Sequence, residues 1–453
     1  MSQPGSLVRR IWSKDASVWT GRDEADWLGW LDEPSRLRAD VDLMLQFADE
    51  VSDRVDAVVL LGMGGSSLAP EVIRRTFRQE TFHVLDTTHP QAIRDLEQRI
   101  DVDRTLFVSA SKSGSTLETR SHTDYFWARS PRGDNWAAIT DPGSALEDLA
   151  REREFAAIFP GVPTIGGRYS ALSPFGMVPA ALMGVDVTRL LERAVEMAEA
   201  CSFDEGNPGL DLGLAMGEAW QGGRDKVVVS PDPGGFGLWV EQLIAESTGK
   251  DGKGLVPAPE ESPDGPDRQA HEVRVTDAYE LGQEFFRWEF ATAVAGSILG
   301  INPFDQPDVQ AAKDKTNEVL AAGGEPDVSP ESSAAELFAQ AREGDYVCIQ
   351  AFVNPTEANE ARVLELAARA RAATGCVVTH GFGPRYLHST GQLHKGGPNT
   401  GLFLQVVDDT GEELPIPGRD FGFGKLIRAQ AAGDFASLKE RGRRVARIRL
   451  EED

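Results

Sequence analysis

The stretch 226–250, KVVVSPDPGGFGLWVEQLIAESTGK, is the part of the sequence that decides the fold. Its apolar start, Lys226 to Ser230, is typical of a buried strand. Pro231 to Gly237 is rich in turn residues, and the remainder has the pattern of a helix. Short apolar strands that alternate with helices indicate a parallel sheet covered on both faces. We therefore expect an α/β protein.

The helical part of this stretch carries a possible acid–base group. Gln242 and Glu246 are four residues apart, so they share one face of the helix, and Leu238, Trp239 and Leu243 beside them are apolar. A carboxylate held against apolar surface is shifted toward its protonated form, which suits a general base near neutral pH. Taken alone, the segment fits an ordinary amphipathic helix with a solvated glutamate at least as well.

Composition limits the classes of function. The chain has 453 residues, enough for two or three domains, and a net charge of −26. That charge argues against nucleic-acid partners and anionic membrane surfaces, and an anionic substrate would need a locally positive pocket. No apolar run approaches the roughly 18 residues of a membrane span, and the N-terminus lacks a signal-peptide core. Three scattered cysteines indicate no disulfide framework or zinc site, so we expect a reducing, cytoplasmic setting.

The pattern of strands and helices divides the chain into three parts. We expect an N-terminal arm over residues 1–55, a first α/β domain over 56–202, and a second over 203–453 that ends in a helical and strand tail. The arm should contain one helix near Pro34 to Val51 and be held to the body by Trp12, Trp19, Trp27 and Trp30. Expected strands are 55–61, 81–85, 105–109 and 136–139 in the first domain, and 226–230, 271–275, 346–352 and 376–379 in the second.

The turn Gly62 to Ser67 follows a strand and precedes a helix, as a dinucleotide-binding turn does. The full pattern needs a third glycine where Ser67 stands. Asp86, at the end of the next expected strand, has the place of a ribose-binding acid. A tight turn without a ligand explains the same residues.

A second loop, Ser109 to Thr116, is the better candidate for an anion site. Ser111, Ser113 and Thr116 gather hydroxyl groups, together with Lys112, at the start of a helix. That end of a helix has unpaired N–H donors and the positive end of the dipole, which suits a phosphate group. The order of residues is not that of a Walker loop, and a serine-capped helix start is the alternative.

Three further segments have chemistry-bearing residues. Gly166 to Ser170 places Arg168 directly after two glycines, where an oxyanion can approach the backbone. Ile301 to Val309 is a proline-marked turn that leads to Lys313. Arg385 to Gly397 contains two of the seven histidines in a glycine-rich loop. A surface loop, a solvated lysine and structural histidines are the respective alternatives.

Together these motifs resemble the glucose-6-phosphate isomerase family of the sugar isomerase (SIS) superfamily. The matching segments occur in the family's order over most of the chain: Gly62 to Ser66, Ser111 to Thr116, Gly166 to Ser170, Gln242 to Lys250, and Phe304 to Gln306 with Lys313. They are most similar to the isomerase half of bacterial transaldolase–isomerase fusion proteins, and Ile11 to Gly21 looks like the segment that joins the two halves there. The chain is too short for a transaldolase barrel as well, so we expect the isomerase only.

The resemblance implies two SIS-type domains, each a mostly parallel sheet flanked by helices. It also implies reversible isomerisation of D-glucose 6-phosphate and D-fructose 6-phosphate through a cis-enediol, with no metal or redox cofactor. The implied catalytic residues are Glu246, His394, Lys313 and Arg168. Those implied to bind the sugar phosphate are Gly65, Ser66, Ser111, Lys112, Ser113, Thr116, Gln242, Gln306 and His388. The resemblance also implies a homodimer. In the common dimeric members the catalytic histidine comes from the partner subunit, and the sequence leaves open whether it does so here.

The position of that histidine departs from the family's usual order. The family has it in a Gln-Leu-Ile-His-Gln-Gly type of segment between the glutamate and lysine motifs, where this chain has only His271. The nearest match, Gln392 to Gly396, comes after Lys313. His394 is therefore favoured, with His388 and then His271 as alternatives.

Other functions remain open from the sequence. One is an isomerase of broader specificity that includes mannose 6-phosphate, because the motifs do not define the stereochemistry at C2. Another is a non-catalytic SIS-type regulator that binds a sugar phosphate, which would not need Glu246, Arg168 and Lys313 together. A nucleotide-dependent dehydrogenase rests on Gly62 to Ser67 alone.

Overall fold

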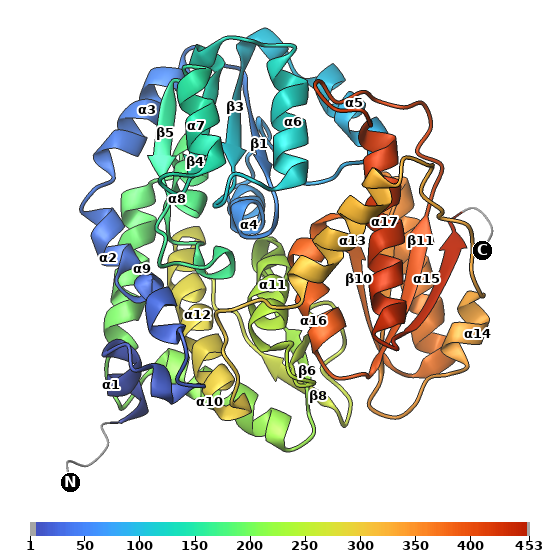
Figure 1. Cartoon of the computed structure of the whole chain (residues 1–453). Coiled ribbons are helices and arrows are strands. Elements are labelled where there is room, and N and C mark those ends of the chain that lie inside the picture. Colours follow the sequence, from blue (N-terminus) through green and yellow to red (C-terminus); the bar gives the residue numbers. More distant parts are fainter. Residues whose placement is uncertain (1–5, 451–453) are drawn as a thin grey trace.

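The structure, a computed structural model, describes residues 6–450 apart from the side chains of residues 309–313. Three parallel sheets organise these residues (Figure 1). The first has the order β2-β1-β3-β4-β5, with β1 at Ala57–Gly62, β2 at Phe82–Leu85, β3 at Thr105–Ala110, β4 at Trp136–Thr140 and β5 at Ala157–Pro160. The four strands expected for the first domain are thus present, and β5 is an addition.

Helices cover both faces of the first sheet. Val58 and Leu60 of β1 point into a core shared with α3 (Asp42–Ser52), α4 (Leu68–Thr76) and α8 (Pro174–Leu182). Val59 and Leu61 point into the core on the other side, with α5 (Pro90–Arg99), α6 (Leu117–Trp127) and α7 (Ala145–Glu152). Successive side chains of a strand alternate between faces, so a strand buried on both faces is apolar throughout.

The strands expected for the second domain are divided between two sheets. One has the order β7-β6-β8, with β6 at Lys226–Val229, β7 at Val256–Pro257 and β8 at Arg268–His271. The strand expected at 271–275 is wrongly placed, because β8 ends at His271 and residues 272–275 form no strand. The other has the order β10-β9-β11-β12, with β9 at Tyr346–Phe352, β10 at Val377–Phe382, β11 at Gly401–Val407 and β12 at Arg444–Arg449. The prediction of a mixed α/β fold with mostly parallel sheets is confirmed, whereas the domain limits stay a proposal.

Helices surround these two sheets as well. Next to β6 lie α11 (Phe236–Thr248) and a layer formed by α9 (Val187–Ala200), α10 (Pro208–Gln221) and α12 (Leu281–Leu299). The last sheet is accompanied by α13 (Val309–Ala321), α14 (Ala334–Phe338), α15 (Glu357–Thr374), α16 (Gly391–Gly396) and α17 (Phe423–Glu440). In Figure 1, α11 lies near the middle of the molecule, below the first sheet, and α16 lies beside it on the side of the last sheet.

The N-terminal arm is held by tryptophans, as expected. The indole N–H groups of Trp12 and Trp19 donate to the carbonyls of Cys201 and Ala293, at 2.9 Å and 2.8 Å. Trp30 stacks on Tyr169. Trp27, by contrast, bonds to Asp23 within the arm. The single helix expected near 34–51 is two helices, α2 (Glu33–Arg38) and α3, because residues 39–41 form a turn; α1 (Leu7–Trp12) precedes them.

The loop after β2 joins the first sheet to the last one. Asp86 forms an ion pair with Arg385, Thr88 donates to Gln430, and His89 lies 3.2 Å from Asp408. These contacts hold the C-terminal unit, residues 334–450, at the carboxyl edge of the first sheet, where ligands bind in open α/β folds. Within residues 6–450, no helix is both long enough and apolar enough to cross a membrane.

Candidate active site

Gln242 and Glu246 share one face of α11, as the sequence predicts. The side-chain amide of Gln242 donates to the carboxylate of Glu246 at 2.9 Å and to the backbone carbonyl of His388, also at 2.9 Å. Gln242 is 4% exposed, so this amide is fixed within the protein. One buried group therefore connects the helix that carries Glu246 to the segment that carries His388.

The turn after β1 lies against this amide. Gly64 has a φ of +54°, and a Cβ there would lie 2.6 Å from the carbonyl oxygen of His388 and 3.0 Å from Nε2 of Gln242. A Cβ on Gly65 would lie 2.0 Å from the carbonyl oxygen of Gly167. Only glycine fits these two positions, because a side chain would displace the backbone of the neighbouring loop. The glycines thus serve close packing of loops at the carboxyl edge of the sheet.

Arg168 is the centre of a polar cluster and is only 1% exposed. Its Nη1 donates to the carbonyls of Glu246, Pro303 and Asp305 at 2.8–3.2 Å. Its Nη2 binds the side-chain oxygen of Gln306. Its Nε lies 3.5 Å from the carboxylate of Glu246. Arg168 therefore joins the end of α11 to the turn 303–306 and places a positive charge beside Glu246.

The surroundings of Glu246 differ from the sequence-based expectation. Its carboxylate lies near an amide donor from Gln242 and a guanidinium from Arg168 rather than against apolar surface. The reason is tertiary, because Arg168 arrives from a loop 78 residues earlier in the chain. Lys250 strengthens the same cluster: its ammonium donates to Asn302 and Asp305, and burial lowers the pKa of this lysine to about 8.

His388 lies at the edge of this cluster and pairs with an acid. Its Nε2 is 2.9 Å from the carboxylate of Glu118, and the two side chains are 15% and 8% exposed. His388 ends the short helix η10 (Arg385–His388). Glu118 stands in the first turn of α6, directly after the loop Ser109 to Thr116, the serine loop. A histidine bonded to a carboxylate through one nitrogen keeps the other nitrogen for proton transfer.

The other two candidate histidines are located elsewhere. His394 is 2% exposed and lies between the rings of Tyr386 and Phe403, with the Cys348 sulfur 3.6 Å from its Nε2. Burial lowers the pKa of His394 well below its usual value. His271, in β8, bonds to Gln269, and burial lowers its pKa to about 4. The structure brings His388, and neither of these, to Gln242 and Gly64.

The serine loop lies next to the turn Gly62 to Ser67, the glycine turn. Gly62, at the end of β1, pairs in register with Ala110, at the end of β3, so the two loops leave the same edge of the sheet side by side. Ser111 and Thr116 share a hydrogen bond of 3.0 Å, and Ser113 and Ser115 one of 2.8 Å. Thr116 caps α6 without a side-chain hydrogen bond to the helix. The hydroxyls and the helix N-terminus together can receive an anion.

The ammonium group of Lys112 forms its hydrogen bonds with groups other than these hydroxyls. Its ammonium donates to Asp141 at 2.8 Å and to the carbonyl of Val162 at 3.0 Å. Burial lowers the pKa of Lys112, although Asp141 opposes that shift. The side chain thus holds the loops after β3, β4 and β5 together, and its role in substrate binding stays a prediction.

Two more predicted site residues are partly placed. Gln306 is exposed and touches Arg168 through its side-chain oxygen. Ser66, in the short helix η4 (Gly64–Ser66), is buried beside Gly62. Lys313 belongs to α13, but its side chain lies outside the described residues.

Asp86 does not have the environment of a ribose-binding acid. Both of its carboxylate oxygens accept from Arg385, at 2.7 Å and 3.0 Å, and the residue is 4% exposed. A carboxylate engaged in this way is not free to bind a ribose hydroxyl. The dinucleotide interpretation of Gly62 to Ser67 thus loses its supporting residue.

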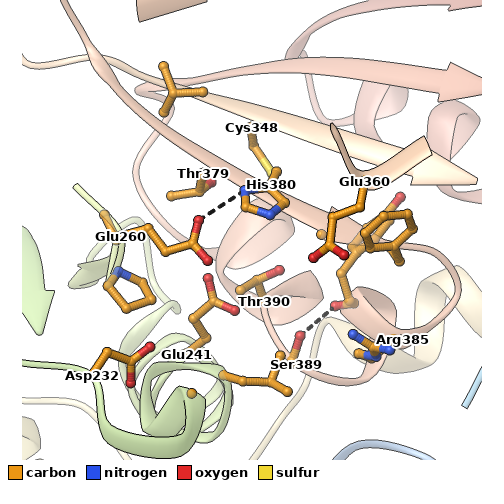
Figure 2. Close-up of a pocket in the computed structure, with 18 of the residues that line it drawn as sticks. Asp232, Glu241, Glu260, Cys348, Glu360, Thr379, His380, Arg385, Ser389 and Thr390 are labelled. Atoms are coloured by element: carbon orange, nitrogen blue, oxygen red, sulfur yellow. Dashed lines mark hydrogen bonds and ion pairs between the residues drawn. The ribbon is translucent and has the colours of Figure 1, made fainter. Parts of the chain in front are cut away.

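A cavity of about 240 Å³ lies against a different face of α11. Figure 2 shows carboxylates of Asp232, Glu241, Glu260 and Glu360 around it. Burial raises the pKa of Glu241 well above its usual value, and the charges of Glu260 and Asp232 add to this. Arg75, His380 and Arg385 line it as well, so its charge is mixed, and neither Gln242 nor Glu246 is among its lining residues. The cavity is therefore separate from the candidate site.

Glu118 is the residue that the sequence analysis missed. It follows Thr116 by two positions, in the first turn of a helix, where an acidic residue is common because it favours the helix dipole. The helix dipole is a sufficient reason for an acid at this position, so no pattern in the sequence indicates that Glu118 also binds His388, which lies 270 residues further along the chain.

Part of this chain is similar to known proteins. The family model of phosphoglucose isomerase matches residues 46–218. A glucose-6-phosphate isomerase of Synechococcus sp. (strain JA-2-3B'a(2-13)) is 35% identical over 214 residues, which cover 44% of this chain and 40% of that protein. One from Thermosynechococcus vestitus is 31% identical over 276 residues, or 52% of each chain. The predicted resemblance to glucose-6-phosphate isomerases is thereby confirmed.

The chain thus spans about half or less of the length of these curated relatives. A crystal structure of a glucose-6-phosphate isomerase from Chlamydia trachomatis superposes with a TM-score of 0.53 and 18% identity, over 70% of this chain and 78% of that one. At this identity the likeness concerns the fold alone, which agrees with the predicted α/β class.

Proposed function

We propose that the chain interconverts D-glucose 6-phosphate and D-fructose 6-phosphate through a cis-enediol intermediate. The observation that carries the proposal is the side-chain NH₂ group of Gln242, which donates one hydrogen bond to the Glu246 carboxylate and a second to the His388 backbone carbonyl. It brings an acid–base carboxylate and a histidine together beside the glycine turn and next to the serine loop. An aldose–ketose isomerase needs such a set: a group for ring opening, a base between two carbons, and an anchor for the phosphate.

The serine loop is the proposed phosphate anchor. Ser111, Ser113 and Thr116 offer hydroxyls, and the start of α6 offers backbone N–H groups. A helix N-terminus favours a dianion through both its donors and its dipole. Gly65 and Ser66 adjoin this loop on the neighbouring strand end.

Ring opening moves a proton between the ring oxygen and the anomeric hydroxyl. We assign this step to His388 rather than His394, because His388 is paired with Glu118 and partly exposed whereas His394 is buried among aromatic rings. Lys313 is retained as its partner from the family resemblance.

Glu246 then moves the proton between C2 and C1. It takes the proton from one carbon and returns it to the other, while Gln242 fixes the orientation of its carboxylate. A positioned acid–base group contributes about 10²–10⁴-fold to the rate. The guanidinium of Arg168 opposes the negative charge that develops on the enediolate, and its burial strengthens that interaction.

The test is direct. The purified chain is supplied with fructose 6-phosphate, without added metal, and formation of glucose 6-phosphate is followed with a coupled dehydrogenase. We expect turnover in both directions and its loss in Glu246→Gln. A protein that binds the sugar phosphate but does not turn it over would instead be a sugar-phosphate-binding regulator. The same assay with mannose 6-phosphate decides the breadth of specificity.

Three further expectations belong to this proposal. The resemblance to family members supports a homodimer, which sedimentation velocity would reveal. A cytoplasmic location is expected from the reducing setting that three buried free cysteines favour. The closer likeness to transaldolase–isomerase fusions stays a prediction from Ile11 to Gly21.

A further inference from the structure

Gln430, far from every motif in the sequence, contacts the proposed catalytic pair. It lies on α17 and is 2% exposed. Its Nε2 donates to Oε1 of Glu118 at 2.7 Å, and its Oε1 accepts from the hydroxyl of Thr88 at 2.6 Å. The same Oε1 of Glu118 is 2.9 Å from Nε2 of His388. Four side chains from four separate segments thus form one chain of hydrogen bonds.

The chemistry of these groups defines the direction of each bond. A carboxylate oxygen only accepts, so the amide of Gln430 must turn its NH₂ group toward Glu118 and its oxygen toward Thr88. Oε1 of Glu118 then already receives one proton donor. Nε2 of His388 approaches the same oxygen, so it must carry a proton as well. Nδ1 of His388 is left as the nitrogen with a lone pair.

We propose that Gln430 is a positioning residue that, with Thr88, fixes Glu118 as an acceptor and so holds His388 in the tautomer with its proton on Nε2. Without the amide, the Glu118 carboxylate loses one of the donors that favour its charged form. A protonated Glu118 that donated to Nε2 of His388 would place the imidazole proton on Nδ1 instead. A histidine in that form lacks the basic nitrogen that ring opening needs. This inference rests on the proposed function, because that function gives His388 its role.

The C-terminal unit contributes two of the four side chains in this chain of hydrogen bonds. Gln430 and His388 both belong to residues 334–450, whereas Thr88 and Glu118 belong to the first sheet and its helices. The hydrogen bonds cross the contact between the two parts. The packing of the C-terminal unit against the first sheet therefore places both His388 and the Gln430 amide at Glu118, within a single chain.

The test is the ¹⁵N spectrum of the histidine rings, with His388 assigned from the signal lost in His388→Ala. In the unsubstituted chain with a neutral His388 ring we expect the Nε2–H tautomer. In Gln430→Met, which keeps the volume but removes the donor and the acceptor, the preference for that tautomer should fall by about tenfold. Thr88→Val, which removes only the outer bond, should shift it in the same direction by less.

Gln405→Met is the matched control. Gln405 is a buried amide of the same unit that bonds to Ala431, the neighbour of Gln430, and to Arg447, but its hydrogen bonds do not include Glu118. It should leave the tautomer of His388 unchanged. An unchanged tautomer in both Gln430→Met and Thr88→Val, with each variant folded, would overturn the proposal, as would an equal shift in Gln405→Met.

Turnover adds a readout that separates the two proposals. If the chain is the isomerase, Gln430→Met should lower kcat for cyclic glucose 6-phosphate about tenfold, with KM within about threefold, and spare proton exchange on open-chain substrate. A shifted tautomer in a chain that never isomerises its substrate would support the positioning role and reject the function. Normal isomerisation with an unshifted tautomer would do the reverse.

Discussion

The side-chain amide of Gln242 lies 2.9 Å from the backbone carbonyl of His388, although 146 residues separate the two in sequence. This bond passes over Gly64, whose missing side chain leaves room for it. It ties the helix of the proposed base to the segment of the proposed ring-opening histidine. The geometry of the site thus depends on a contact between α11 and the C-terminal unit.

Glu246→Gln should abolish isomerisation while substrate binding stays within about tenfold, because the amide keeps the shape of the side chain but cannot move a proton. The control is Glu241→Gln, on the same helix but facing the cavity of Figure 2. Burial raises the pKa of Glu241, so an uncharged amide is a close substitute there, and activity should be retained. Steady-state kinetics and isothermal titration compare the two. Turnover by Glu246→Gln would remove Glu246 from the role.

His388→Ala should slow turnover of cyclic substrate by about 10²–10⁴-fold and affect proton exchange on open-chain substrate far less. His394→Ala should act differently, because it opens a cavity between Tyr386 and Phe403. We expect it to lower the melting temperature and leave kcat within about tenfold. A larger catalytic loss in the His394 variant, at equal stability, would return the assignment to His394.

Substitutions in the serine loop should change KM, whereas substitution of Lys112 should change the stability of the protein. Ser113→Ala and Thr116→Val should each raise KM with little change in kcat, because they hold a group remote from the reacting carbons. Lys112→Ala should instead cost about 1–3 kcal/mol of stability, since it leaves Asp141 without its ammonium partner. Kinetics paired with urea unfolding separate the two effects. If Lys112→Ala raises KM and leaves the unfolding curve unchanged, the ammonium binds substrate after all.

The buried carboxyl group of Glu289 should make the stability of the protein depend on pH. It is 1% exposed in α12, and burial raises its pKa well above the usual value of 4.5. The folded protein therefore keeps this carboxyl protonated at a pH where the unfolded chain ionises it. Its contribution to the free energy of unfolding is present in full below pH 4.5 and declines as pH rises toward the raised pKa, by up to about 1.4 kcal/mol per pH unit.

Glu289→Gln removes that titration, so the variant should gain stability relative to the original chain as pH is raised from 5 to about 8. Urea unfolding at several pH values measures the difference. Parallel stability curves for the two proteins would show that Glu289 titrates normally in the folded state.

Local patterns predicted the secondary structure well. The strand expected at 105–109 is β3 with one more residue, and the strand expected at 136–139 is β4 with one more residue. These signals depend on residues a few positions apart, whose side chains share a face or alternate between faces. The motif order was sufficient for the family resemblance, since each motif is a short segment with its own chemistry.

What the sequence by itself determined is therefore the set of local elements, the residue types at the loops, and the pairing of Gln242 with Glu246 one helical turn apart. Only the tertiary structure decided which histidine reaches them. His388 and His394 stand six residues apart in one loop region, yet the first meets Glu118 and the second is buried among aromatic rings. Their difference arises from packing against segments up to 270 residues away, which local spacing does not encode. The same is true of Arg168 beside Glu246 and of Gln430 behind Glu118.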